Sequence, residues 1–238
     1  MIRSILLLFA CTPICVFSQT GLPEYKRLSL GINTEANYVE SHLRKNRPGE
    51  NSKDFSESNE IGKIGGTVGL NLDYRLTPQL SVGTGLHFSD RGYATPKTEL
   101  SWATPNDSYP THSKTLFTSY FVEFPLRVKY RFRTANCGIY VTGGPSVGHL
   151  IFRKTAVFSY YGNRHEKSVF SKPGNGYTPN LFSFHLGIGI EVPLSDRLSV
   201  LLEPLYRQTL TSLSHHKEVQ RYFHSLGLNT HFLLRFKK

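Results

Sequence analysis

Apolar and polar residues alternate along most of this chain with a period of two. In residues 121–132 every even position is apolar or aromatic, whereas the odd positions after the first carry Glu123, Pro125, Arg127, Lys129 and Arg131. Successive side chains of a β-strand point to opposite faces, so this spacing predicts a strand with one apolar and one charged face. As a helix, the same residues would scatter apolar groups around the whole circumference.

The same alternation recurs in seven further segments, which gives eight predicted strands. They span residues 27–39, 65–76, 80–88, 121–132, 137–152, 181–194, 198–210 and 223–236. The fifth is the least regular, because its glycines and Pro145 indicate a bulge or a bend. Three connections, at residues 77–79, 133–136 and 195–197, are short and carry residues typical of tight turns. The connections at 41–61, 89–116, 154–179 and 213–221 are longer and polar.

Short turns at one end and long loops at the other are typical of outer-membrane barrels. We therefore predict an all-β fold, an eight-stranded antiparallel up-and-down transmembrane β-barrel over residues 20–238, with periplasmic termini in the bacterial outer membrane. The apolar face should contact lipid, and the glycine-rich polar face should line a filled interior, because eight strands leave room for little more than side chains. A soluble, exported lipocalin-like barrel with the faces reversed is the alternative.

Aromatic residues support lipid on the outside, because they gather near both ends of the predicted strands. Such girdles match the two membrane interfaces. The short-turn end has Tyr74, Tyr130, Phe132 and Phe236, and the long-loop end has Phe88, Phe117, Tyr120, Phe182 and Tyr222.

The first residues, MIRSILLLFACTPICVFSQT, differ from the rest of the chain. Arg3 precedes an apolar core, and Ser18 and Gln19 follow it, so we predict a signal peptide over residues 1–19. A buried N-terminal strand is one alternative, and a lipoprotein cleavage box at LFAC is another, although it leaves only about six apolar residues. Removal of the signal peptide leaves Cys137 as the single cysteine, so no internal disulfide is expected.

Basic residues outnumber acidic ones, 28 to 17, and the formal net charge is +11. For an exported chain, this charge favours outer-membrane lipid, lipopolysaccharide or envelope protein partners over nucleic acid. We expect a monomer without a cofactor.

The segments FVEFPLRVKYRF, YVTGGPSVG, FHLGIGIEVPLSDRLSVLLEPLYRQTL and HSLGLNTHFLLRF, within residues 26–237, resemble the PorT-like outer-membrane β-barrel proteins typical of Bacteroidetes-type bacteria. The resemblance implies a fold more than an activity, because these motifs are patterns and not catalytic signatures. The name-giving member resembles an accessory protein of a secretion and gliding apparatus, which makes such a link one role to consider.

Seven charged residues stand at predicted interior positions: Asp73, Glu123, Arg127, Lys129, Glu191, Glu203 and Arg207. A buried charge without a partner costs several kcal/mol, so we predict an interior network of ion pairs. Depth counted from the short turns groups Arg127 with Glu203, Lys129 with Glu191 and Asp73, and Glu123 with Arg207. The inward His87, His185 and His231 lie at different predicted heights. Polar filling is therefore expected from them rather than the converging ligands that zinc requires.

The segment 154–179 combines basic and aromatic residues, namely Lys154, Tyr160, Tyr161, Arg164, Lys167 and Lys172. Such a surface could contact lipopolysaccharide phosphates or a partner protein, and a solvated loop is the alternative. We expect a non-enzymatic structural, adhesion or accessory protein that acts through its extracellular loops. The chain could instead be a barrel-embedded lipid-modifying enzyme or a narrow porin.

Overall fold

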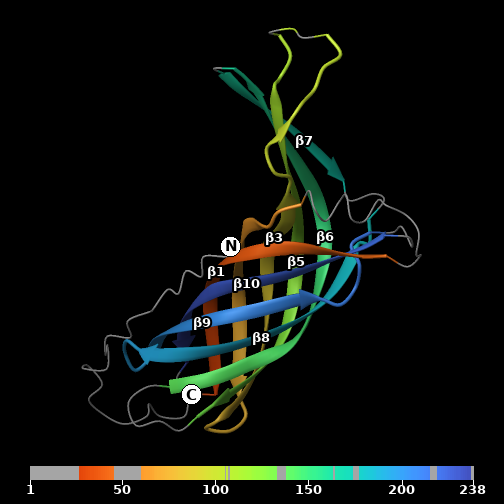
Figure 1. Cartoon of the computed structure of the whole chain (residues 1–238). Coiled ribbons are helices and arrows are strands. Elements are labelled where there is room, and N and C mark those ends of the chain that lie inside the picture. The colour runs from red at the N-terminus through yellow and green to blue at the C-terminus, as the bar shows by residue number, and fades with distance from the viewer. Residues whose placement is uncertain are drawn as a thin grey trace, which may run out of the picture.

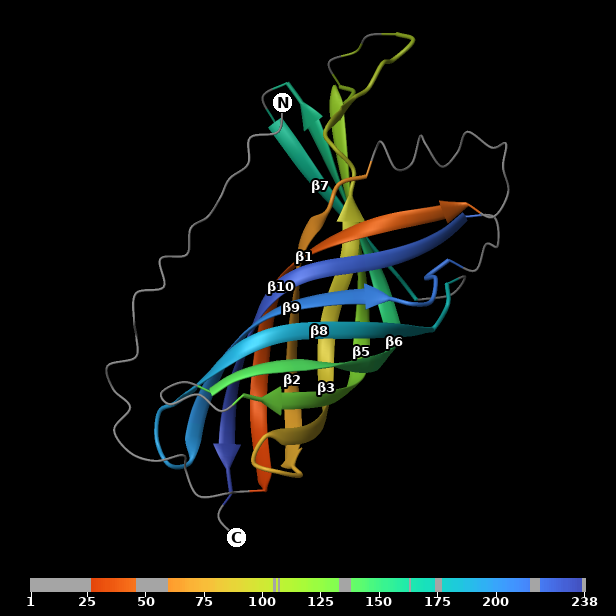
Figure 2. The same cartoon turned by 60° about the horizontal axis from the view of Figure 1, so that its bottom comes forward.

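The computed structural model describes residues 27–45, 60–104, 106, 108–132, 138–162, 164–173, 177–214 and 219–236. Within them, antiparallel strands form one sheet that closes into a ring of eight (Figures 1 and 2). The ring consists of β1 (Leu28–Lys45), β2 (Lys63–Arg75), β3 (Leu80–Ala94), β5 (His112–Arg131), β6 (Gly138–Tyr161), β8 (Asn180–Pro193), β9 (Leu198–Thr209) and β10 (Val219–Arg235). In the described part of the chain, no helix is long and apolar enough to cross a membrane.

Each ring strand pairs with the strand before it and the strand after it, and β10 pairs with β1 to close the ring. Both described chain ends lie beside the short turns, where the Phe236 N–H donates to Leu28 O at 3.2 Å. The predicted eight-stranded antiparallel barrel is therefore confirmed.

Two further strands lie outside the ring. β4 (Thr98–Glu99) pairs with the start of β5, and β7 (Arg164–Pro173) pairs with the end of β6. Figure 1 shows β7 and the neighbouring ends of β5 and β6 extending beyond the other strands. We call the described residues within 95–119 and 153–173 together the protrusion.

The prediction of long loops at 89–116 and 154–179 was wrong over much of their length. β3 continues to Ala94, β5 begins at His112, and β6 continues to Tyr161 before it turns into β7. The period-two signal fades over much of this length because the start of β5 and the end of β6 extend beyond the ring. Their side chains no longer alternate between an apolar exterior and a packed interior, and those of β7 described as far as Ser171 are exposed on both faces.

Burial follows the predicted alternation within the ring. On β8, Leu186 is 56% exposed on the outer face, whereas His185 is 3% exposed on the inner face. On β5, Leu126 is exposed, and the side chains of Arg127 and Lys129 are buried inside. The apolar face therefore points outward, as expected for a barrel surrounded by lipid and not for a lipocalin.

Interior glycines make room for large side chains of neighbouring strands. A Cβ atom at Gly83 would lie 2.1 Å from Asp73 Oδ1, and one at Gly189 would lie 2.4 Å from Tyr140 Cζ. The crowding inferred from the glycine-rich face is thus present.

Aromatic side chains cover the outer surface near both ends of the ring. At the long-loop end, Tyr120 stacks between Phe88 and Phe152, with ring centroids 5.7 and 4.4 Å away. The assignment of Phe117 to this girdle was wrong. Its ring stacks on Tyr93 at 4.7 Å, and Tyr93 packs against an interior cluster.

Hydroxyl groups fix two of the short turns. Thr77 Oγ1 accepts from the Leu80 N–H at 2.9 Å, and Ser195 Oγ accepts from the Leu198 N–H at 3.1 Å. The predicted turn at 133–136, the predicted signal peptide at 1–19 and Cys137 all lie outside the described residues.

Candidate functional site

The barrel interior is filled by charged side chains at several levels. Nearest the short turns, Glu191 on β8 accepts hydrogen bonds from Arg131 on β5 and Arg235 on β10. The prediction had grouped Glu191 with Lys129. Barrel strands are tilted and staggered, so depth counted from each turn does not give the level at which two side chains meet.

At the next level, Asp73 lies between two cations, 3.6 Å from Arg127 Nη2 and 3.5 Å from Lys129 Nζ. The predicted pair of Lys129 with Asp73 is therefore present. Arg127 also lies beside His231, with Nη1 3.2 Å from His231 Nε2, and the same nitrogen of His231 lies 3.7 Å from Glu203. Arg127 and Glu203 therefore share a level, as predicted, with His231 between them.

Glu203 has other partners at this level. It accepts from the Tyr140 hydroxyl at 3.0 Å and lies 3.7 Å from His231 Nε2. Tyr140, whose side chain is fully buried, was not among the predicted interior groups.

The third level contains the predicted pair of Glu123 and Arg207, whose charged atoms are 3.5 Å apart. Two residues absent from the prediction complete it. Arg91 Nη2 lies 2.5 Å from Glu123, and Glu35 accepts from Arg207 at 2.9 Å. Glu35 could have been found from its inward position on the first strand, whereas Arg91 fell within a segment predicted as loop.

The three inward histidines are buried, as expected from their positions. Asn71 connects two of them, because its Oδ1 is 2.8 Å from His87 Nε2 and its Nδ2 is 3.3 Å from His231 Nδ1. Among the residues described here, no group of three or more His, Cys, Asp or Glu side chains is arranged to hold a metal ion.

Two apolar clusters, which the alternation did not predict, also lie inside the ring. The outer apolar cluster, toward the long loops, comprises Val39, Phe121, Leu150, Leu181, Leu213 and Phe223. The inner apolar cluster, toward the short turns, comprises Tyr140, Leu201 and Leu233. The described side chains therefore fill the ring along most of its length.

Cations cover the outer apolar cluster. Two tyrosines, Tyr93 and Tyr177, pack against the cluster. Arg221 lies 3.8 Å from the ring centroid of Tyr93, and Arg153 lies 3.7 Å from that of Tyr177. Arg221 also donates to both carboxylate oxygens of Glu60, at 2.5 and 2.8 Å.

The predicted basic and aromatic surface is located on strands of the protrusion, not on a solvated loop. Lys154, Tyr160 and Tyr161 are half-buried on β6, and Arg164 and Lys167 are exposed on β7. Lys172 belongs to β7, but its side chain lies outside what the structure describes.

Cations lie over two of these aromatic rings. Arg164 is 4.8 Å from the ring centroid of Tyr161, and Lys97 is 4.2 Å from that of Tyr160. Along β6 and β7 successive side chains alternate between faces, so Tyr161 and its register partner Arg164 lie on the face opposite to Tyr160.

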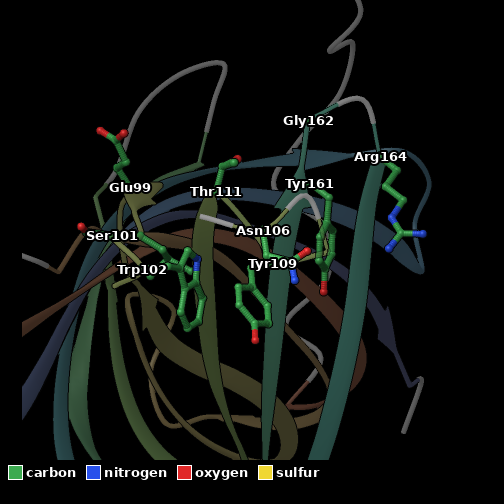
Figure 3. A pocket seen from close by; sticks show the side chains of 10 residues that line it. Glu99, Ser101, Trp102, Asn106, Tyr109, Thr111, Tyr161, Gly162 and Arg164 are labelled. Carbon is green, nitrogen blue, oxygen red and sulfur yellow. The ribbon is translucent and has the colours of Figure 1, made fainter. Parts of the chain in front are cut away.

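An open cleft of about 730 Å³ lies at the end of the protrusion, between the described residues of 99–111 and residues 161, 162 and 164 (Figure 3). Its lining is Glu99, Leu100, Ser101, Trp102, Asn106, Tyr109, Thr111, Tyr161, Gly162 and Arg164. The cleft could not be predicted, because it depends on the pairing of two segments about fifty residues apart.

Several solved barrels resemble this chain. Neisserial surface protein A is 12% identical, with a TM-score of 0.41 over 87% of this chain and 97% of that chain. The attachment invasion locus protein Ail of Yersinia pestis is 13% identical, with a TM-score of 0.31 over 87% of this chain and 100% of that chain. The outer membrane protease OmpT of Escherichia coli is 9% identical, with a TM-score of 0.40 over 92% and 99%.

None of these structural likenesses bears on function, and no curated protein matches the chain. The sequence itself matches the outer membrane protein beta-barrel domain over residues 17–214, which is most of its length. The chain therefore belongs to the outer membrane protein beta-barrel domain family.

Proposed function

We propose that this protein is a monomeric, non-enzymatic barrel of the bacterial outer membrane that acts as a structural, adhesion or accessory protein through its protrusion. The observation that carries the proposal is the difference between the ring and the protrusion. Paired charges and two apolar clusters fill the ring, whereas basic and aromatic side chains stand on strands that extend beyond it.

A filled interior disfavours a pore, because an eight-stranded ring has little space beyond its own side chains. An embedded hydrolase would need a serine activated by a histidine. The buried Ser89 donates instead to Glu123, which also pairs with Arg91 and Arg207. Glu123 is therefore held by cations, an arrangement that suits structure better than catalysis.

In outer-membrane barrels the short turns face the periplasm, so the protrusion should lie outside the cell and both chain ends inside. Cysteine labelling tests this orientation in a Cys137→Ser background. Lys167→Cys on β7 should react with a membrane-impermeant maleimide on intact cells, whereas Gln79→Cys in a short turn should react only after permeabilisation. The reverse pattern would overturn the orientation.

Conductance tests the non-porin part of the proposal. Purified protein in planar bilayers should give no discrete conductance steps under conditions in which a general porin gives them. Regular single-channel steps would establish a narrow pore instead.

Lipopolysaccharide is the ligand that the basic residues of the protrusion suit best, because clustered cations attract its phosphates. The proposal rests on Lys154 of β6 and on Arg164 and Lys167 of β7. Lys172 also belongs to β7. The double variant Arg164→Ser/Lys167→Ser should bind lipopolysaccharide more weakly than the parent protein at low salt. If the double variant and the parent protein bound lipopolysaccharide equally well, these two basic residues would have no role in binding it.

The link to a secretion or gliding apparatus rests on the PorT-like resemblance. Deletion of the gene should then impair secretion or gliding, and reintroduction of the intact chain should restore it. A deletion strain with normal secretion and gliding would remove this accessory role and leave the adhesion role in place.

A further inference from the structure

The cleft at the end of the protrusion has the size and lining of a ligand site. Its volume of about 730 Å³ falls within the usual range for pockets that hold small organic molecules. Such pockets combine aromatic walls with a few polar groups that orient the ligand. Figure 3 shows the rings of Trp102, Tyr109 and Tyr161 in a row, with the guanidinium group of Arg164 beyond them.

The aromatic side chains of the cleft are partly exposed to water. Trp102 and Tyr109 are each 45% exposed, although their ring centroids are only 5.0 Å apart and their planes are tilted by 35°. Tyr161 comes from β6 and faces the same cleft. Three aromatic side chains from two segments therefore line one open cleft, which marks a surface for contact with a ligand or partner.

Hydrogen bonds fix this wall in place. The indole N–H of Trp102 donates to Pro110 O at 2.7 Å, so the ring is oriented and its polar atom is occupied. The Leu100 N–H donates to Thr111 O at 2.8 Å, and the Thr111 N–H donates to Tyr160 O at 2.8 Å. These bonds tie the segment to β6, so a ligand would meet a surface that needs little ordering on binding.

The polar groups of the cleft include both acceptors and donors. Glu99 and Ser101 belong to its lining, as does Asn106, whose Oδ1 accepts from Ser108 N at 2.8 Å. Arg164 contributes a guanidinium that lies 3.7 Å from the Glu166 carboxylate. A phosphate or sulfate site would need several cations aimed at one point, and here acid and base are balanced.

We infer that this cleft binds a neutral saccharide. The C–H face of a pyranose ring can stack on aromatic faces, whose negative quadrupole attracts polarised hydrogens. Its hydroxyl groups act as both donors and acceptors, which matches a lining of carboxylate, hydroxyl, amide and guanidinium. The site deepens the proposed adhesion role, and its biological use depends on the proposed position of the protrusion outside the cell.

Trp102 is the only tryptophan of the chain, so intrinsic fluorescence reports directly on the cleft. The test titrates the folded full-length protein, in a detergent without a sugar headgroup, with maltotriose, cellotriose, mannotriose and N,N′,N″-triacetylchitotriose. At least one of these neutral probes should shift the Trp102 emission in a saturable way.

Variants separate a stacking site from a general solvent effect. Tyr161→Ala keeps the tryptophan and should weaken binding about tenfold or more, because one stacking face is lost. Glu99→Gln should weaken it less. The matched control is Phe170→Ala, an aromatic residue 55% exposed on β7 outside the cleft lining, which should bind like the parent protein.

Heat-modifiable migration on gels shows that each variant is folded before it is titrated. The inference is overturned if no neutral probe gives a saturable shift, or if Tyr161→Ala responds like the parent protein. A response only to heparin oligosaccharides, or only to a proline-rich peptide, would also overturn it by assigning another ligand class. Binding in solution does not depend on orientation, so cysteine labelling of the wrong membrane side would contradict the proposed function and not the site.

Discussion

The barrel interior and the protrusion use the same residue types in opposite ways. Inside the ring, Glu123 is 2% exposed and is held by Arg91 and Arg207. On β7, the side chains of Arg164 and Glu166 are 67% and 55% exposed and lie 3.7 Å apart. Burial, and not residue type, therefore separates a charge that supports the fold from one that is available to a ligand.

The aromatic residues show the same contrast. Tyr140 is fully buried and donates to Glu203, whereas Trp102 and Tyr109 are open to water on a hydrogen-bonded frame. Stability should therefore depend strongly on interior residues and weakly on those of the protrusion. Variants in the two regions test this contrast, from the largest expected effect to the smallest.

The largest loss of stability is expected from Glu123→Leu. This change leaves Arg91 and Arg207 buried beside an apolar group, and breaking a buried ion pair costs about 3–5 kcal/mol. Urea unfolding of protein refolded into lipid vesicles measures the change in the free energy of unfolding. Glu123→Gln, which keeps hydrogen-bonding capacity, should cost less, and a loss below about 1 kcal/mol in Glu123→Leu would contradict a structural role for this network.

The outer apolar cluster provides the next test. Phe121→Ala should lower the free energy of unfolding by about 3 kcal/mol, because it removes a large side chain from a packed interior and leaves a cavity. The same variant should still give no conductance steps in planar bilayers, because the charged levels below it remain. Ion conduction through Phe121→Ala would show that the apolar cluster alone closes the barrel.

The sequence predicted the ring because lipid outside and a packed interior inside impose a period of two on each strand. It missed the apolar clusters, which interrupt the polar inner face. In the sequence, these clusters are marked by two adjacent apolar residues, one on the outer face of the strand and one on the inner face. Such pairs are Tyr38–Val39, Tyr120–Phe121, Leu150–Ile151, Leu181–Phe182, Tyr222–Phe223, Leu201–Leu202 and Leu233–Leu234.

Which charges lie inside could also be predicted, but not all of their partners. Glu123 and Arg207 meet as expected, whereas Glu191 meets Arg131 and Arg235 because the stagger of the strands changes the relative heights of side chains. The cleft was beyond prediction, since it depends on how Trp102 and Tyr109 pack beside the end of β6.

A smaller effect is expected where a glycine makes room for an interior charge. A Cβ at Gly83 would lie 2.1 Å from Asp73 Oδ1, so Gly83→Ala must displace that carboxylate from Arg127 and Lys129. We expect a loss of about 2 kcal/mol in the same unfolding assay, within the range for overpacked interiors. The control is Gly66→Ala, whose Cβ would meet nothing closer than Glu35 O at 3.5 Å, and a loss equal to that of Gly83→Ala would contradict the crowding argument.

The smallest effect is expected on the protrusion itself. Glu166→Gln removes a partner of Arg164 from an ion pair that is exposed on both sides, so the free energy of unfolding should change by less than about 0.5 kcal/mol. High salt screens exposed pairs, so the difference from the parent protein should vanish in concentrated sodium chloride. A loss as large as that of Glu123→Leu would mean that the protrusion folds together with the ring. A change in the free energy of unfolding close to zero would instead show that residues on the surface of the protrusion can be substituted without destabilising the barrel.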